Sequence, residues 1–282
     1  MENVIIVDQI SLDQKIQKMI NDGKNKLHVV SDFDKTMTKA FVGGKYRSSL
    51  LAVLRDEKYL TPDYSAKAQA LFDHYHPMEI DPNISIQEKK LLMMEWWTKH
   101  FELLLNSGLN KKDVQKAVQS TSIEFRDYLT NILDMLDIHQ IPLIILSASG
   151  LGYDGIHRYL KSIKKLYENT YILSNTFQRD RDGNAVDIHQ PIIHSFNKEE
   201  SLIENSPFYG KIKNRNNIIL LGDSPGDSYM AHDSDNKTII KIGFLNDNID
   251  QNLELFKKHF DILITGDGSM KYVYDLLRNI IK

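Results

Sequence analysis

Two pairs of aspartates stand where this chain could carry out phosphoryl transfer. Asp32 and Asp34 directly follow the apolar run at residues 27–31, and Asp223 and Asp227 lie in the segment GDSPGDS. Carboxylates placed side by side at a strand end repel one another, and a divalent cation is the simplest compensation. Because Mg²⁺ prefers hard oxygen ligands, Asp32, Asp223 and the backbone carbonyl of Asp34 could supply such a site.

A hydroxyl group and an ammonium group complete the pattern. Ser147 and Ala148 follow another apolar run, and Lys198 lies between that run and GDSPGDS. A phosphate ester needs its charge neutralised and its leaving oxygen protonated. Asp32 could attack as a nucleophile to form an aspartyl-phosphate, while Asp34 served first as general acid and then as general base. Ser147 and Lys198 would hold the phosphoryl oxygens.

Each of these motifs alone also has an ordinary structural explanation. Asp-x-Asp is common at turns, and GDSPGDS could be a solvated Asx-turn loop. Ser147 could be a helix N-cap and Lys198 a surface lysine. Their order favours the chemical interpretation, since three motifs each follow an expected strand and the lysine precedes the third. The loop at Asp32 lacks the further ligands of an EF-hand, and the chain lacks a Walker A motif.

Five apolar runs predict buried strands. Helical patterns lie between most of them, and this alternation is typical of a parallel sheet covered by helices. Ligands of such sheets bind at the carboxyl ends of the strands, so the motifs should meet at one edge. The predicted strands are residues 27–31, 142–147, 217–222, 238–242 and 261–265.

The long gap between the first two strands predicts an insertion. Residues 45–135 contain helix-like segments and no convincing strand. The clearest helix begins after Ser85 as N-cap, with Glu88 three residues later and Gly108 beyond its end. We therefore expect an α/β fold with a Rossmann-like parallel-sheet core. Its domains would be a catalytic core of residues 1–40 and 137–282 and an inserted helical cap of residues 41–136.

Two further features bear on the insertion and the core. Met93, Trp97 and Phe101 fall at helical spacing, which predicts a packing stripe on the cap helix. The Asp182-Gly183 turn between β-prone runs predicts a hairpin that leaves the main sheet.

The composition is that of an ordinary globular protein. Among 282 residues, 41% are hydrophobic and 26% charged, and the net charge is −3. The basic residues are scattered, so no nucleic-acid partner is expected. With no cysteine there is no disulfide framework and no thiolate metal site. The first residues contain an apolar run of only four, which predicts neither a signal peptide nor a membrane span and favours a cytoplasmic location.

Taken together, the motifs resemble those of the haloacid dehalogenase-like hydrolases. More closely, the chain resembles the cytosolic pyrimidine 5′-nucleotidase family, also called type III 5′-nucleotidases. The supporting stretches are SDFDKTMTKAF, MEIDPNISIQEK with MMEWWTKHFELLL, HSFNKEESL, IILLGDSPGDSYMA and IIKIGFLND.

The resemblance implies roles for the four aspartates. Asp32 would be the nucleophile and a Mg²⁺ ligand. Asp34 would be the acid and base, and its main-chain carbonyl would bind the metal. Asp223 would complete the metal site, and Asp227 would orient the site without binding the metal itself.

The same resemblance assigns the substrate contacts. Ser147 and Ala148 would contact the phosphate, and Lys198 would bind it. A cap glutamate would read the base, and Glu95 occupies that place in the sequence. From the residues alone Glu95 would be a solvated helix glutamate.

The function expected from this resemblance is Mg²⁺-dependent hydrolysis of a nucleoside 5′-monophosphate through an aspartyl-phosphate. Pyrimidine nucleotides such as UMP and CMP are favoured as the small-molecule partner. The segment Val42-Gly43-Gly44-Lys45 replaces an Asn-Gly segment of the family, so other substrates stay open. The alternatives are a phosphatase for another small ester, transfer of phosphate to a nucleoside, and a catalytically silent scaffold that binds phosphometabolites.

Overall fold

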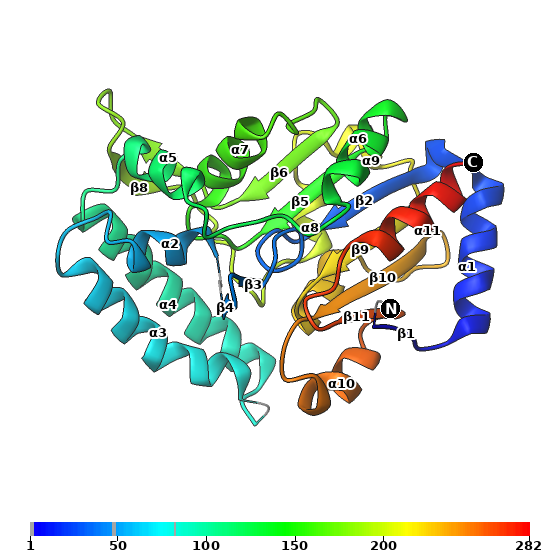
Figure 1. Cartoon of the computed structure of the whole chain (residues 1–282), viewed down its shortest axis with the longest axis horizontal. Coiled ribbons are helices and arrows are strands. Elements are labelled where there is room, and N and C mark those ends of the chain that lie inside the picture. The colour runs from blue at the N-terminus through cyan, green and yellow to red at the C-terminus, as the bar shows by residue number, and fades with distance from the viewer. Residues whose placement is uncertain (1–2, 47–48, 82) are drawn as a thin grey trace.

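One mostly parallel sheet forms the centre of the molecule (Figure 1). The computed structural model describes residues 3–46, 49–81 and 83–282, and within them this sheet has seven strands. They are β1 Val4–Ile6, β2 Leu27–Ser31, β5 Leu143–Ser147, β6 Thr170–Ser174, β9 Asn217–Gly222, β10 Thr238–Leu245 and β11 Ile262–Thr265. The spatial order is β1-β11-β10-β9-β2-β5-β6, and only β1 runs antiparallel to its neighbour.

The five predicted strands are all present in this sheet. β10 runs three residues further than predicted, because Gly243, Phe244 and Leu245 pair with β11. Two strands, β1 and β6, were not predicted. Both lie at the sheet edges and are only half-buried, so they lack the continuous apolar run that identifies a central strand.

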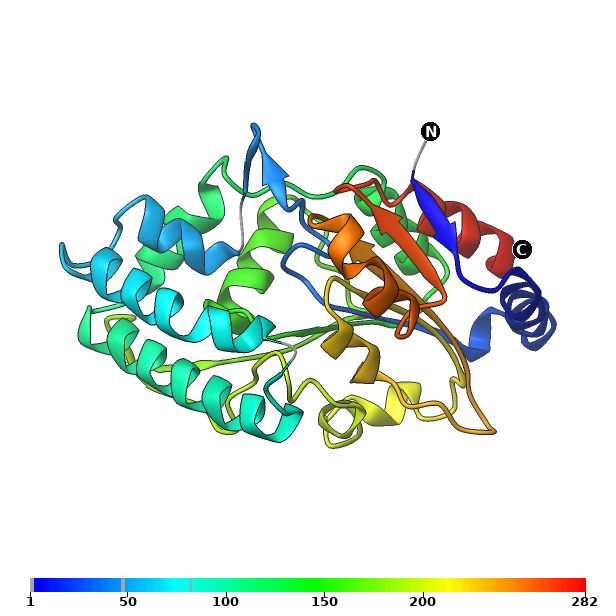
Figure 2. The ribbon, with the colours of Figure 1, turned by 90° about the horizontal axis from the view of Figure 1, so that it is seen from below.

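Helices cover both faces of the sheet, and Figure 2 shows the central strands nearly edge-on between them. Successive strand residues point to opposite faces, so Val29 and Val30 belong to different apolar clusters. The cluster of Val29 includes side chains of α1 Gln9–Asp22, α6 Leu129–Ile138, α7 Gly152–Ser162 and α11 Lys271–Ile281. The cluster of Val30 includes side chains of α8 Glu200–Glu204, α9 Tyr209–Ile212, α10 Ile249–Lys257 and the 3₁₀ helix η2 Pro225–Met230.

The chain between β2 and β5 forms the inserted region. Its helices are α2 Leu50–Asp56, α3 Tyr64–Ile80, α4 Ile86–Asn106 and α5 Lys111–Gln119, with α6 following. The expectation of no strand in residues 45–135 is wrong at one place, because β4 Lys45–Tyr46 pairs with β3 Phe41–Val42. Gly43 and Gly44 both have positive φ in the turn between them, as a tight hairpin requires. Strands of two residues are too short to show an alternating pattern.

Helix α4 forms as its sequence predicts. Ser85 Oγ accepts a hydrogen bond from the Glu88 backbone N–H at 3.2 Å, and Gly108 follows the end with a φ of 72°. Met93 and Phe101 of the expected stripe are buried in the core. Helices α3 and α4 lie side by side at the left of Figure 1. None of the helices in the described ranges is long and apolar enough to cross a membrane.

The predicted hairpin is present as β7 Phe177–Arg179 and β8 Ala185–Ile188. Gly183 adopts a φ of 88° in its turn. The hairpin packs against α4, where the rings of Phe101 and Phe177 meet edge to face with centroids 5.6 Å apart. It therefore supports the inserted helices from the side of the core.

Candidate active site

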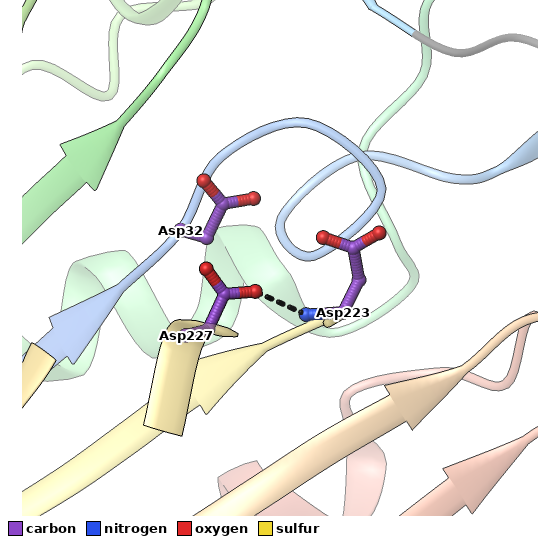
Figure 3. A group of neighbouring side chains, drawn as sticks. All are labelled: Asp32, Asp223 and Asp227. Atoms are coloured by element: carbon purple, nitrogen blue, oxygen red, sulfur yellow. Dashed lines mark hydrogen bonds between the residues drawn. The ribbon is translucent and has the colours of Figure 1, made fainter. Parts of the chain in front are cut away.

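Three carboxylates meet at the carboxyl ends of neighbouring strands (Figure 3). Asp32 follows β2, Asp223 follows β9 and Asp227 lies in η2, and each offers an oxygen within 4.8 Å of the others. β2 lies between β5 and β9, so the three strands that carry the sequence motifs are adjacent. The parallel register thus brings together residues that are far apart in the sequence.

Asp32 is buried at the centre of this cluster. Its backbone N–H donates to the carbonyl of Leu221 at 3.0 Å, which continues the β2–β9 pairing by one residue. Burial raises the pKa of the Asp32 carboxyl; Lys198 opposes this shift, and Asp227 and Asp223 add to it. Lys198 Nζ lies 2.8 Å from Asp32 Oδ1 and supplies the nearest positive charge.

Asp227 holds the loop after β9 in shape. Its Oδ2 accepts from the backbone N–H of Asp223 at 3.0 Å and from the N–H and Oγ of Ser224 at 2.9 Å each. Its Oδ1 forms an ion pair with Lys198. A Cβ on Gly222 would lie 2.2 Å from the Asp227 Cβ, so the close approach requires glycine. Asp227 therefore positions both Asp223 and Lys198.

Asp34 lies beside the cluster and faces the same cavity. Phe33 points the other way into the core, where it meets Phe125 and Tyr159 edge to face. Asp34 Oδ1 accepts from the Leu50 N–H at 3.3 Å, at the start of α2. Burial raises the pKa of the Asp34 carboxyl to about 6 against the opposing effect of hydrogen bonds. A carboxyl with such a pKa can hold and release a proton near neutral pH.

Ser147 and Ala148 line the cavity at the end of β5. Ser147 Oγ accepts a hydrogen bond from the Ser149 backbone N–H at 3.1 Å. The loop then turns sharply at Gly152, where a Cβ would lie 1.7 Å from the carbonyl oxygen of Asn175. These contacts hold the loop after β5 in shape, and Ser147 lines the same cavity as the carboxylates.

A cavity of about 270 Å³ extends from the carboxylates to the inserted helices. Its core end is formed by the residues described above, and its far end by α3 and α4. The lining residues from these two helices are Tyr64, Ala68, Phe72, His76, Glu79, Trp96, Trp97 and His100. Both tryptophans thus face the cavity, a role that their helical spacing alone did not indicate.

The aromatic side chains at the far end form a continuous group. The ring centroids of Phe72 and Trp96 are 6.1 Å apart at an interplanar angle of 63°. His76 stacks on Phe72 with centroids 4.6 Å apart. Aromatic rings that line a cavity in this way can stack on a flat heterocycle.

The structure does not bring Glu95 to this cavity. Its side chain is 52% exposed on the outer side of α4 and forms an ion pair with Lys99 at 2.5 Å. The cap carboxylate that lines the cavity is Glu79, at the end of α3. Burial works against the charged form of Glu79, but contacts with His76 and Ser195 outweigh it and lower the pKa. The only sequence signal was the acid in the MEIDPN stretch.

Lys35 and Tyr46 also line the cavity and were not singled out by the sequence. Lys35 Nζ lies 2.7 Å from Asp223 Oδ2. Both residues come from the segment that follows β2, whereas Lys198 comes from the segment between β8 and α8.

The carboxylate cluster could hold a divalent cation. Three oxygen donors converge within 4.8 Å, and hard oxygen ligands are those that Mg²⁺ takes. Burial together with like-charged neighbours disfavours an ionised Asp32, and a cation in the cluster would relieve that repulsion. The donor set therefore fits a hard metal ion.

Comparison with known proteins gives a consistent result. The pyrimidine 5′-nucleotidase (UMPH-1) family model matches residues 35–281. The 7-methylguanosine phosphate-specific 5′-nucleotidase of Gallus gallus is 33% identical over 94% of this chain and 92% of its own length. The enzyme of that name from Mus musculus is 35% identical over 92% of this chain and 86% of its own.

Solved structures agree with these matches. The crystal structure of cytosolic 5′-nucleotidase IIIB bound to cytidine has a TM-score of 0.86 and 31% identity, covering 99% of this chain and 94% of that one. A substrate-bound phosphoserine phosphatase, at 14% identity and a TM-score of 0.55, shares the fold alone over 88% of this chain and 96% of its own. This chain therefore belongs to the pyrimidine 5′-nucleotidase (UMPH-1) family, with a haloacid dehalogenase-like fold and the activity of a 5′-nucleotidase, a phosphoric monoester hydrolase.

Proposed function

We propose that this 5′-nucleotidase hydrolyses CMP and 7-methyl-GMP in preference to other nucleotides, with Mg²⁺ as its metal ion. The observation that carries the proposal is one cavity lined by Asp32, by Glu79 and by the aromatic rings of α3 and α4. UMP, which the sequence favoured together with CMP, is then the weaker pyrimidine substrate. A cytoplasmic location belongs to the same proposal, since a relative is named cytosolic.

The far end of the cavity supports a base with donors or positive charge. Glu79 is anionic, because contacts with His76 and Ser195 lower its pKa despite burial. The 4-amino group of cytosine can donate to a carboxylate, whereas uracil presents a carbonyl there. The 7-methylguanine ring is cationic, and an aromatic face such as that of Trp96, which lines the cavity, attracts cations. One relative is named as specific for 7-methylguanosine phosphate and another was solved bound to cytidine, which supports this preference.

The chemistry at the core end would proceed in two steps. In the first, an Asp32 carboxylate oxygen bonds to phosphorus while the bond from phosphorus to O5′ breaks. The electron pair of that bond goes to O5′, which takes the proton from Asp34. In the second, Asp34 removes a proton from water as the water oxygen attacks phosphorus. The bond to Asp32 breaks, phosphate leaves and the Asp32 carboxylate is restored.

The neighbouring groups would bind and orient the phosphate. Ser147 Oγ and the backbone at Ala148 lie at the end of β5, beside the carboxylates. Lys198 Nζ, at 2.8 Å from Asp32 Oδ1, would neutralise charge on the phosphoryl oxygens. Mg²⁺ bound by Asp32, Asp223 and the carbonyl of Asp34 would supply further charge neutralisation.

The inserted helices would act as a cap. In this proposal residues 41–136 form the cap domain, and residues 1–40 with 137–282 form the catalytic core. Closing such a cap excludes water from the phosphoryl group and places the base against the aromatic rings.

Phosphate release from a substrate panel tests the proposal. The panel contains CMP, UMP, 7-methyl-GMP, GMP, AMP and ribose 5-phosphate, each with Mg²⁺ and with EDTA, for wild type and Asp32→Asn. We expect release that depends on Mg²⁺, is fastest for CMP and 7-methyl-GMP, and is lost in the variant. Preference for GMP or AMP would refute the assigned base class. Release only from ribose 5-phosphate would favour a phosphatase for another small ester.

A further inference from the structure

Lys35 is held in an unusual backbone conformation directly after the catalytic candidates. Its φ of 61° is in the left-handed region, which costs a residue with a side chain about 1 kcal/mol or more. Such a conformation persists where its surroundings determine it, and it often marks a functional position. The backbone conformation of Lys35 therefore points to a function for its side chain.

Three hydrogen bonds fix this backbone. The Lys35 N–H donates to Thr38 Oγ1 at 2.8 Å. Its carbonyl accepts from Arg126 Nη2 at 2.5 Å and from Asn246 Nδ2 at 3.0 Å. Arg126 is itself buried and paired with Asp267 at 2.9 Å. These contacts hold the backbone of Lys35, and its side chain lines the cavity.

The ammonium group of Lys35 reaches the carboxylate cluster. Lys35 Nζ lies 2.7 Å from Asp223 Oδ2, and the two side chains are 28% and 10% exposed. Burial works against the charge of Lys35, but Asp223, Tyr46 and Glu79 hold its pKa well above the ordinary value. Lys198 forms ion pairs with Asp32 and Asp227. Each carboxylate of the cluster therefore has a lysine partner within the protein.

We propose that Lys35 is an internal counter-ion of the metal site, which competes with Mg²⁺ for Asp223 and thereby sets how tightly this protein binds the metal. In the metal-free protein its ammonium group neutralises Asp223. When a divalent cation binds the cluster, Lys35 leaves Asp223 or shares it. The inference rests on the metal site proposed above, and it goes beyond it by assigning the affinity to a residue outside the ligand set.

The competition predicts that removing the ammonium group tightens metal binding. Lys35→Met keeps most of the side-chain volume without the charge. Lys35→Gly also removes the charge and adopts positive φ without strain, so it separates charge from backbone effects. Lys39→Met is the matched control, because Lys39 lies in the same segment with 29% exposure and pairs only outside the cluster, with Glu124 and Asp127.

Calorimetric titration of metal-stripped protein with Mg²⁺, without nucleotide, tests the inference. We expect both Lys35 variants to lower the Kd for Mg²⁺ about tenfold, as expected for losing one competing charge-assisted contact, and Lys39→Met to leave it within about twofold. The rise in Tm from EDTA to saturating Mg²⁺ should also be larger in both Lys35 variants.

Two outcomes would overturn the inference. Folded Lys35→Gly with unchanged or weaker Mg²⁺ affinity would show that the ammonium group does not compete, whether or not Lys35→Met folds. Wild-type protein that binds no Mg²⁺ would remove the metal site and this inference together. Neither outcome alters the base preference, because the titration contains no nucleotide and the substrate panel measures that preference separately.

Discussion

Glu79 Oε1 accepts a hydrogen bond from Ser195 Oγ at 2.6 Å, which joins α3 of the inserted region to the segment that carries Lys198. A second link runs from α4, where Lys90 Nζ pairs with Glu199 at 2.6 Å. Lys198, between these two anchors, contacts Asp32. The segment from Ser195 to Glu199 therefore contacts both Glu79, the proposed base-binding carboxylate, and Asp32, the proposed nucleophile.

Replacing Glu79 should weaken the recognition of the base. For Glu79→Gln we expect kcat/KM for CMP to fall about 10- to 100-fold, because a hydrogen bond to a charged group contributes about 1.5–3 kcal/mol. Glu95→Gln is the matched control and should stay within about twofold, since Glu95 lies outside the cavity. Steady-state kinetics on purified variants measure both values.

Ribose 5-phosphate serves as the second control for Glu79, because it lacks a base. Its hydrolysis by Glu79→Gln should be unchanged if the carboxylate acts on the base alone. An equal loss for CMP and ribose 5-phosphate would mean that Glu79 acts through Ser195 on the Lys198 segment instead. A loss in Glu95→Gln as large as in Glu79→Gln would contradict the assignment.

The sequence predicted which core residues lie together in the candidate site, because its signals are local. Asp32, Ser147 and Asp223 each follow a strong apolar run, and parallel strands place such positions at one edge. The cap residues carry no equivalent signal. Glu79 reaches the cavity through a contact with Ser195, 116 residues away, which no local pattern encodes. Trp96 lies beside an apolar stripe, and helical periodicity cannot distinguish a core-facing ring from one that lines a cavity.

The fold was predicted best where strands are buried on both faces. β2, β5 and β9 are buried along their whole length and read as continuous apolar runs. β6 is half-buried at the sheet edge, and its residues are mixed in character. The sequence also showed no sign of the role of Lys35. A lysine next to two aspartates in the sequence is expected to be solvated, and only the structure shows its backbone conformation.

Gly222→Ala should disrupt the loop that Asp227 holds. The added methyl group would lie 2.2 Å from the Asp227 Cβ and 2.8 Å from its Oδ2, so the carboxylate must move. We expect the free energy of unfolding to fall by about 1–3 kcal/mol, the usual cost of overpacking. Activity should fall at least tenfold, since Asp227 positions both Asp223 and Lys198.

Gly210→Ala provides the control for this substitution. No atom lies within 4 Å of a Cβ placed on Gly210, and its backbone does not need glycine. Gly210→Ala should therefore have wild-type activity, and its stability should equal or slightly exceed that of the wild type. Urea unfolding and phosphate-release assays measure both effects, and a Gly222→Ala protein with full activity would show that the loop tolerates the displacement.

Arg126→Met should destabilise the protein more than any surface arginine substitution. The buried guanidinium group donates to the carbonyls of Lys35, Thr36 and Gly268 and pairs with Asp267. Removing it takes the cation from the half-buried Asp267 carboxylate and the donor from the carbonyls of Thr36 and Gly268, which costs about 3–5 kcal/mol. Urea unfolding measures the change, with the exposed Arg181→Met as control. A loss below about 1 kcal/mol for Arg126→Met would mean that water replaces the guanidinium contacts.

Acid should destabilise the fold partly through His28 of β2. Burial lowers the pKa of His28 from 6.5 to about 4, so the folded protein keeps this imidazole neutral. The unfolded chain binds a proton there below pH 6.5, whereas the folded protein does so only near pH 4. The stabilisation from neutral His28 is thus fully present above pH 6.5 and is lost as the pH falls toward 4. A shift of this size corresponds to about 3 kcal/mol.

His28→Leu should remove this contribution and flatten the acid side of the stability curve. We expect urea unfolding between pH 7 and 4 to show a decline that is smaller in His28→Leu than in wild type by up to about 3 kcal/mol. His189→Leu, at an exposed position, should follow the wild-type curve. The comparison uses the change with pH within each protein, so a lower baseline stability of His28→Leu does not affect it. Parallel curves for wild type and His28→Leu would show that the imidazole gains a proton in the folded protein as readily as in the unfolded chain.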